Sequence, residues 1–423
     1  MSPGGGIGRR KGLKIPREQS RAGSTPALGI NNGKYIFIMH IKLNNFVDDV
    51  HALLTKTNIS RQVHEPSIPQ STLKYLGDCI KSTYLSSEGK YLQKFETGLQ
   101  KLTGSNKILL TNTGTSALQV ALKIIGVEQK EVLVPSMTFV ATTNAIIYNN
   151  GIPHFIDCEQ NKLNIDYRLL EDYLKKITRI RNNKCINKIT NKEIVGIIVV
   201  HSYGYPANFD EIKNICKKYH LQVLEDAAAA LGSYYKDKHL GTLGRMGIIS
   251  FNGNKIITTG MGGALICKTT SDYKVAKHLI STAKVPPVHK YLHDKIGFNF
   301  RMANINAASG YSQLLNMREI LRKKAELRKM YFDLISTYDF CDLLESMSNE
   351  KPNYWINNIV ISAKNKSYKD QLVKKFHKKR IYVRELWTPQ HRLKMFKNYP
   401  RMDLTNSIDI WKRTISLPSS INL

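Results

Sequence analysis

The alternation of short apolar runs with amphipathic segments, which begins at about Thr111, constrains the fold of this chain more than any other feature. The runs EVLVP, IPHFID, EIVGIIVV and LQVLE are strand-sized and apolar, which is typical of strands buried on both faces. The segments TSALQVALKII and DEIKNICKKYH carry apolar residues at helical spacing. This pattern predicts an α/β fold with a mostly parallel sheet, covered on both faces, whose ligands bind at the carboxyl ends of the strands.

The C-terminal part of the sequence predicts a second, smaller lobe. At 423 residues the chain is longer than the roughly 250–300 residues at which one hydrophobic core stops growing. A helical block at about 306–335 is followed by the strand-like WINNIVISA, the helix-like YKDQLVKKFHKK and the strand-like RIYVREL. We therefore predict a large domain over 39–315 and a small α+β domain over 316–423. We expect the charges of the helical block to be solvated: Glu319, Arg322, Lys323, Lys324, Glu326 and Arg328.

Residues 1–38 differ from the rest of the chain, being rich in Gly, Arg, Pro and Ser. They lack the apolar core of about 7–15 residues that a signal peptide carries, and their composition predicts a disordered extension. Met39 is our candidate for the true start of the protein. Native peptides recovered from upstream of it would contradict that hypothesis.

The formal net charge of +30 raises the question of nucleic-acid binding, because clustered Lys and Arg neutralise phosphates. The basic residues are spread along the chain, so we interpret the charge as a compositional bias that would also favour an anionic substrate. The six cysteines form no CxxC pair, which disfavours a zinc site or a disulfide framework and is typical of a reducing cytoplasm. No apolar run approaches the ~20 residues of a membrane span. We predict a cytoplasmic protein that holds no metal and does not cross a membrane.

Two residues indicate the chemistry of the site. Lys255 follows an apolar strand-like run in SFNGNKIITTGMGGAL, where its amine can be desolvated and nucleophilic. Asp226 comes directly after LQVLE, at the carboxyl end of a predicted strand. Each alone has an ordinary explanation, as a solvated lysine or a helix-capping aspartate. Together they suggest pyridoxal 5'-phosphate (PLP) chemistry.

Two further segments suit a phosphorylated, flat cofactor. TNTGTSAL opens the first strong helix, and backbone N–H groups at a helix N-terminus are a ready phosphate seat. Plain capping by Thr113 or Thr115 is the alternative. Phe139 follows the strand-like EVLVP, where it could stack on a cofactor ring or instead belong to the core.

Segments in a fixed order give the sequence a family resemblance. They are NTGTSAL, EVLVPSMTFVATTNAI, IPHFIDC, VVHSYGYPANFDEI, LEDAAAALGS, SFNGNKIITTGMGGAL and GFNFRMANINAASGYSQL. From about Val47 to its end the chain resembles the DegT/StrS family of PLP-dependent sugar aminotransferases, which have fold type I. The segments VHEPSIP, STYLSSEGKYLQKFE, NYWINNIV and ELWTPQHRLKMF are most similar to the branch that aminates C4 of UDP-4-keto-6-deoxy-N-acetylhexosamines, on routes to bacillosamine- or legionaminic-type sugars.

The resemblance implies roles for named residues. Lys255 would bond to the cofactor and then move a proton between the substrate carbon and the cofactor. Asp226 would face the pyridine nitrogen and keep it protonated. The remaining cofactor contacts would come from Phe139 on the ring, from Gly114, Thr115, Ser116 and Ser250 at the phosphate, and from the partner subunit's Asn299.

The resemblance also implies substrate contacts, and the sequence departs from the family at one position. Many members carry Gln, His or Glu three residues after the aspartate, beside the cofactor, and here the residue is Ala229. His201 matches a position near the cofactor, although a hydrogen-bonded histidine that orients its loop is an equal interpretation. Arg384, Trp387 and His391 lie in or beside ELWTPQH and could contact the nucleotide sugar, or be an ordinary surface arginine and core tryptophan.

Taken together, the resemblance predicts a homodimeric aminotransferase with shared active sites. Glutamate would be the amino donor and a UDP-linked 4-keto-6-deoxy-N-acetyl sugar the acceptor. A GDP- or dTDP-linked keto sugar, or amination at C3, is the alternative within the fold. A non-catalytic protein that regulates or binds nucleic acid is the alternative from another class, and the pairing of Lys255 with Asp226 argues against it.

Overall fold

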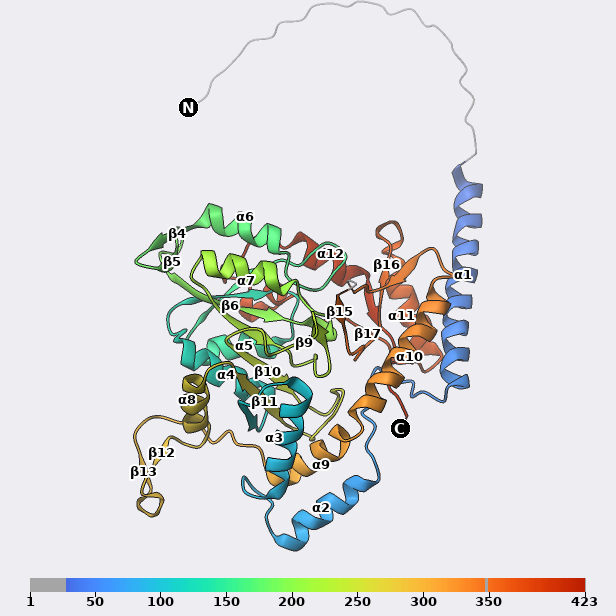
Figure 1. Ribbon diagram of the computed structural model, residues 1–423. Helices are drawn as coiled ribbons and strands as arrows, with labels where there is room; N and C mark the ends of the chain where they lie inside the picture. The colour runs from blue at the N-terminus through green and yellow to red at the C-terminus, as the bar shows by residue number, and fades with distance from the viewer. Residues whose placement is uncertain (1–27, 347–348, 423) are drawn as a thin grey trace, which may run out of the picture. The chain divides into compact units, whose positions relative to one another are not determined.

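The computed structural model describes residues 28–346 and 349–422 (Figure 1), and it consists of two units, Met1–Asn45 and Phe46–Leu423. Most of the predicted disordered extension, residues 1–27, lies outside the described residues. Helix α1, Leu28–Lys56, begins inside the stretch that we predicted to be disordered. The run YIFIMHI at 35–41 supplies more apolar residues than a disordered segment carries.

The main sheet follows the predicted alternation of strands and helices. Its spatial order is β1 (Ile108–Thr111), β11 (Gly263–Cys267), β10 (Met246–Ser250), β7 (Gln222–Asp226), β6 (Glu193–Val200), β2 (Glu131–Pro135) and β3 (Ile152–Ile156). The strands from β10 to β3 are parallel, and β11 runs antiparallel to both β1 and β10. A hairpin of β4 (Thr178–Arg181) and β5 (Lys184–Asn187) pairs with β6. The predicted α/β class with a mostly parallel sheet is confirmed.

Helices cover both faces of this sheet (Figure 1). Neighbouring residues of β2 show why, because Leu133 packs into one hydrophobic core whereas Val132 and Val134 pack into the other, as the period of a strand requires. The helices are α3 (Lys90–Thr103), α4 (Gly114–Ile125), α5 (Val140–Tyr148), α6 (Tyr167–Ile177), α7 (Phe209–Lys218) and α8 (Thr270–Ile280). Helix α2 (Ser71–Ser82) packs instead against the helix at 304–314. The helices predicted from TSALQVALKII and DEIKNICKKYH are α4 and α7.

The predicted helical block at 306–335 is divided into α9 (Asn304–Leu314) and α10 (Met317–Ile335). The prediction of a solvated charged face is wrong for one residue of α10. Lys324 is completely buried, on the same stripe as Ile320, Leu327 and Tyr331. Spacings of three and four residues place these side chains on one face of the helix.

The C-terminal residues build a second, antiparallel sheet in the order β14 (Cys341–Leu343), β16 (Asn358–Ile361), β18 (Thr414–Ser416) and β17 (Arg384–Glu385). Helices α11 (Tyr368–Lys378) and α12 (Thr405–Arg413) accompany it. The division near residue 315 stays a prediction, since Phe46–Leu423 forms one compact unit. The shorter strands are β8 (Tyr234–Tyr235), β9 (Lys238–His239), β12 (Lys284–Val285), β13 (Leu292–His293) and β15 (Glu350–Lys351).

Candidate active site

A cavity of about 350 Å³ lies at the carboxyl ends of the parallel strands. Its lining includes the last residues of β6, β7 and β10, namely Val200, Asp226 and Ser250, and the first turn of α4. This is the edge at which an open α/β sheet binds ligands. The predicted site residues that line it are Gly114, Thr115, Phe139, His201, Asp226, Ala229, Ser250, Lys255 and Trp387.

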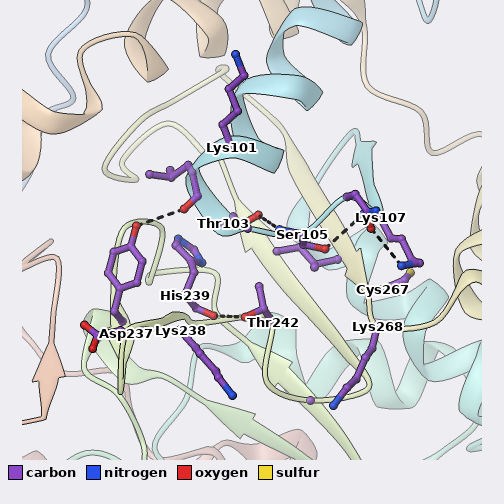
Figure 2. Close-up of a pocket in the computed structure, with 17 residues that line it drawn as sticks. Lys101, Thr103, Ser105, Lys107, Asp237, Lys238, His239, Thr242, Cys267 and Lys268 are labelled. Atoms are coloured by element: carbon purple, nitrogen blue, oxygen red, sulfur yellow. Dashed lines mark hydrogen bonds between the residues drawn. The ribbon is translucent and has the colours of Figure 1, made fainter.

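A larger cavity, of about 560 Å³, lies elsewhere, beside the C-terminal end of α3. Its lining is basic and includes Lys101, Lys238 and Lys268. Figure 2 shows that Lys101 points away from the other two lysines. Because the Lys101 ammonium group points away from those of Lys238 and Lys268, the three do not converge on one anion, and the size of this cavity alone does not mark it as the site.

Lys255 lies in the loop between β10 and β11, and backbone hydrogen bonds join the two ends of this loop. The N–H of Phe251 donates to the carbonyl of Gly262 at 2.9 Å, and the N–H of Thr259 donates to the carbonyl of Phe251 at 3.0 Å. The Lys255 side chain is half-buried, and its Nζ lies 4.1 Å from the centre of the Trp355 ring. Desolvation lowers the pKa of Lys255 to about 8, although the charge of Asp226 acts in the opposite direction. An amine with this pKa is partly unprotonated near neutral pH and can act as a nucleophile or a base.

Asp226 is held in a fixed orientation at the end of β7. Its Oδ2 accepts a hydrogen bond of 2.7 Å from Oγ1 of Thr142, and its Oδ1 accepts one of 3.1 Å from the N–H of Ala228. Because the Thr142 hydroxyl donates to Asp226, the 2.9 Å contact between Thr138 and Thr142 must be donated by Thr138. A relay of two hydroxyls therefore positions the carboxylate.

The N-terminus of α4 combines capping with an open first turn. Oγ1 of Thr113 accepts a 3.0 Å hydrogen bond from the N–H of Ser116, and their two hydroxyls are 2.8 Å apart. The N–H of Ser116 is therefore engaged in the cap and Ser116 lies outside the cavity lining, so its contact with the phosphate stays a prediction. A Cβ on Gly114 would stand 3.0 Å from Cβ of Ser250, so only a glycine leaves the space between the first turn of α4 and Ser250 open. The donors of the first helical turn have no partner within the helix.

Phe139 belongs to the cavity wall and not to the core, since it is 52% exposed. Its ring centre is 6.0 Å from that of Trp387. Trp387 is stacked on Tyr203 at 4.3 Å, and Tyr203 on Trp355 at 5.9 Å. These four side chains form a continuous row, which we call the aromatic row, and three of them line the cavity.

His201 has both ring nitrogens engaged inside the protein. Its Nε2 lies 3.0 Å from a carboxylate oxygen of Glu225, and its Nδ1 accepts from the N–H of Ala207 at 3.2 Å. Glu225 also accepts hydrogen bonds from the backbone N–H groups of Gly241, Leu243 and Gly244. The geometry favours the interpretation that His201 orients its loop over the one in which it contacts substrate.

Three further predicted residues lie outside the lining of the cavity. Arg384 is exposed on β17, and Asn299 is exposed where it bridges to Ser281. Nδ1 of His391 is 2.7 Å from Oγ of Ser136, and desolvation lowers the pKa of this histidine to about 4. Within one chain, these side chains are not brought to Lys255.

Sequence reasoning missed two residues of the site. Thr142 is one helical turn from Thr138, a spacing that is common and that carries no functional signal by itself. Trp355 lies in NYWINNIV, which contributes to the resemblance, but its contact with Lys255 joins positions 100 residues apart in sequence. Only the fold could reveal that contact.

The donor set fits PLP. An amine and a carboxylate line one cavity, a side chain at position 114 would fill the space beside Ser250, and the exposed face of Phe139 can cover a flat ring.

Among the described residues, no helix combines the length and the apolar character that crossing a membrane requires.

Comparisons with known proteins agree with this geometry. The model of the DegT/DnrJ/EryC1/StrS aminotransferase family matches residues 66–423. EpsN of Bacillus subtilis, named as a pyridoxal phosphate-dependent aminotransferase, is 34% identical over 82% of this chain and 88% of its own length. GDP-perosamine synthase of Escherichia coli O157:H7 is 32% identical over 84% and 92%, and UDP-4-amino-4,6-dideoxy-N-acetyl-beta-L-altrosamine transaminase of Campylobacter jejuni is 29% identical over 83% and 90%. The solved structure of Helicobacter pylori PseC, an aminotransferase involved in the biosynthesis of pseudoaminic acid, has a TM-score of 0.76 at 24% identity, covering 85% of this chain and 93% of that one.

Proposed function

The chain belongs to the DegT/DnrJ/EryC1/StrS aminotransferase family, and from that premise we propose that it transfers an amino group from glutamate to C4 of a UDP-linked 4-keto-6-deoxy-N-acetyl sugar. The observation that carries the aminotransferase chemistry is the meeting of Lys255 and Asp226 in one cavity at the strand ends. When bound, PLP carries the amino group between donor and acceptor, and its ring takes up the electron pair released at the reacting carbon.

The residues that line the cavity have separate roles in the proposed reaction. With a pKa of about 8, Lys255 can take a proton from the substrate carbon and return it, because its neutral and charged forms are both populated near neutral pH. Asp226, fixed by Thr142 and Ala228, supplies a negative charge for the ring nitrogen. The first turn of α4 and Ser250 would hold the phosphate, and Phe139 would cover the ring.

Two relatives support different acceptors. The Campylobacter jejuni transaminase is named for a UDP-linked acetylated amino sugar, which favours our first choice. The slightly more similar Escherichia coli synthase is named for a GDP-linked sugar, which supports a GDP-linked acceptor as the second candidate. Ala229 lines the cavity and leaves space where many family members place a polar side chain, so the acceptor must be oriented mainly by other residues.

The deciding experiment offers several acceptors to one enzyme. Full-length protein with PLP and glutamate is incubated separately with UDP-, GDP- and dTDP-linked 4-keto-6-deoxy sugars, and the aminated carbon is identified by NMR of the product. Turnover of the UDP sugar with nitrogen at C4 supports the proposal, and turnover of the GDP sugar alone replaces it by the second candidate. Borohydride reduction should trap the cofactor on Lys255, and Lys255→Ala should lose both the trap and the activity.

We also propose that the active form is a cytoplasmic homodimer in which the partner subunit's Asn299 completes the phosphate seat. The exposure of Asn299 and its absence from the cavity lining of its own chain support this arrangement, and the six free cysteines are compatible with a reducing compartment. Co-expressed Lys255→Ala and Asn299→Ala chains should recover about a quarter of wild-type activity, since half of randomly mixed dimers are hybrids with one intact site. Recovery of none would contradict shared sites.

A further inference from the structure

The amine of Lys255 rests against an aromatic face. Its Nζ is 4.1 Å from the ring centre of Trp355, well within the roughly 6 Å over which a cation is attracted to an aromatic ring. Trp355 is only 3% exposed, and desolvation strengthens this attraction. The ring side of the contact is therefore shielded from water, although Lys255 itself is half-buried.

The Trp355 residue is fixed from four directions. Its Nε1 donates to the carbonyl of Asn254 at 2.8 Å, and its backbone N–H donates to Oδ1 of Asn353 at 2.9 Å. Its carbonyl accepts from Nζ of the buried Lys324 at 3.0 Å, and its ring stacks on Tyr203. The ring cannot turn away from the cavity without breaking its hydrogen bond to Asn254 and its stacking on Tyr203, and the other two contacts hold the backbone of Trp355 in place.

The first of these contacts ties the ring to the lysine loop itself. Asn254 is the residue directly before Lys255, so the indole group and the lysine backbone are held together as one unit. A free lysine side chain loses about 2 kcal/mol of rotamer entropy when it is ordered. A fixed ring face can compensate for much of that loss, and it does so without accepting a proton as a carboxylate would.

We propose that Trp355 is a positioning residue for Lys255: the face of its indole ring holds the ammonium group whenever the amine is not bonded to the cofactor. The amine then stays inside the cavity, ready to move a proton or to bond again. The inference rests on the proposed function in one respect, namely that Lys255 is the lysine that bonds to PLP.

The test measures the ionisation of Lys255 and uses no sugar. Full-length protein, cofactor-free and separately loaded with pyridoxamine phosphate, is labelled with acetic anhydride between pH 6 and 11, and the Lys255 peptide is quantified by mass spectrometry. The cofactor-free wild type should titrate with a pKa of about 8. Trp355→Leu keeps the site apolar but removes the ring, so in both forms the pKa of Lys255 should fall by about one unit. Trp355→Phe should recover most of the difference.

A matched control is available in the chain. Trp411 also has a lysine over its ring, with Nζ of Lys369 at 5.3 Å, and it lies outside the cavity lining. Trp411→Leu should leave the titration of Lys255 unchanged. A Lys255 pKa in folded Trp355→Leu that equals or exceeds the wild-type value would overturn the proposal, since a merely structural loss would admit water and raise it.

A second measurement needs no substitution of Trp355. The chain has three tryptophans, so in the double variant Trp387→Phe with Trp411→Phe all tryptophan fluorescence comes from Trp355. Its fluorescence should change as Lys255 loses its proton near pH 8, and Lys255→Met should abolish that change. Emission that is constant from pH 7 to 9 would overturn the proposal, whereas borohydride trapping on another lysine would reject the proposed function.

Discussion

The hydroxyl of Thr142 donates a hydrogen bond of 2.7 Å to Oδ2 of Asp226, across 84 residues of sequence. It is one of two hydrogen bonds that fix the carboxylate, and it links the first turns of α5 to the end of β7. The orientation of the Asp226 carboxylate therefore depends on a helix that contributes no charge of its own.

Thr142→Val should lower kcat/KM for transamination by about 10- to 100-fold, because a hydrogen bond to a charged group contributes about 1.5–3 kcal/mol. Steady-state kinetics with saturating PLP measure the loss. Thr143→Val is the matched control, since the buried Oγ1 of Thr143 has no hydrogen-bond partner among the described residues. Equal activity in the two variants would show that Thr142 does not position Asp226.

Gly114→Ala should weaken the binding of PLP by about 10-fold or more while leaving the fold intact. The added Cβ would crowd Ser250 at 3.0 Å, whereas alanine in a helix is otherwise favourable by about 0.5–1 kcal/mol. Fluorescence titration of cofactor-free protein gives the Kd, and a thermal melt gives the stability. In Gly77→Ala the new Cβ meets nothing within 4 Å, so its Kd should not change.

Trp387→Ala should raise KM for the sugar acceptor by about 10-fold and leave KM for glutamate nearly unchanged. The ring lines the cavity and extends the aromatic row beyond Tyr203, so its loss removes contact area, and an aromatic contact contributes about 0.5–1.5 kcal/mol beyond area. Separate half-reaction kinetics distinguish the two substrates. Trp411→Ala serves as the control, and equal losses in both half-reactions would instead indicate damage to the shared site.

Lys324→Met should change how stability depends on pH. Burial lowers the pKa of Lys324 well below its usual range, so unfolding takes up a proton at any pH between the folded value and about 10.4. Stability of the wild type therefore rises with pH in this window, by up to about 1.4 kcal/mol per unit, and the methionine variant loses that slope. Urea unfolding at pH 7, 8 and 9 measures it. Lys329→Met, on the exposed side of the same helix, should keep the wild-type slope.

Glu131→Gln should destabilise the protein by about 1.5–3 kcal/mol at pH 7, because a buried neutral amide accepts weaker hydrogen bonds from His154 and Asn187 than a carboxylate does. Burial would raise the pKa of Glu131, but hydrogen bonds from His154 and Asn187 outweigh that effect and lower it. The stabilisation is thus complete above about pH 4.5 and is lost as the pH falls through the folded pKa. The difference between the urea midpoints of variant and wild type should narrow as the pH falls below about 4.5. Glu128→Gln, at an exposed position, should have the same urea midpoint as the wild type at each pH.

The sheet could be predicted from sequence because its strands are buried on both faces, which leaves continuous apolar runs such as EIVGIIVV. Lys255 and Asp226 could be predicted because strand ends place them at one edge. The burial of Lys324 was missed, although its position on the stripe with Ile320 and Leu327 was a readable signal, since lysine is so seldom buried.

Contacts between distant segments could not be predicted. The seat of the Lys255 amine on Trp355 and the hydroxyl that orients Asp226 arise only when the chain is folded. The resemblance assigns Ser116 to the phosphate, and it does not reveal that the N–H of Ser116 donates to Oγ1 of Thr113. A sequence motif does not show which of its polar groups already have hydrogen-bond partners in the cap of the helix.

Strand β1 at the edge of the main sheet pairs with β11, and α4 begins directly after β1. Synthesis from the N-terminus therefore produces the first turn of α4 long before β11, and it produces the tryptophans of the aromatic row later still. A polypeptide that ends before β11 or before Trp355 should therefore be unable to retain the coenzyme.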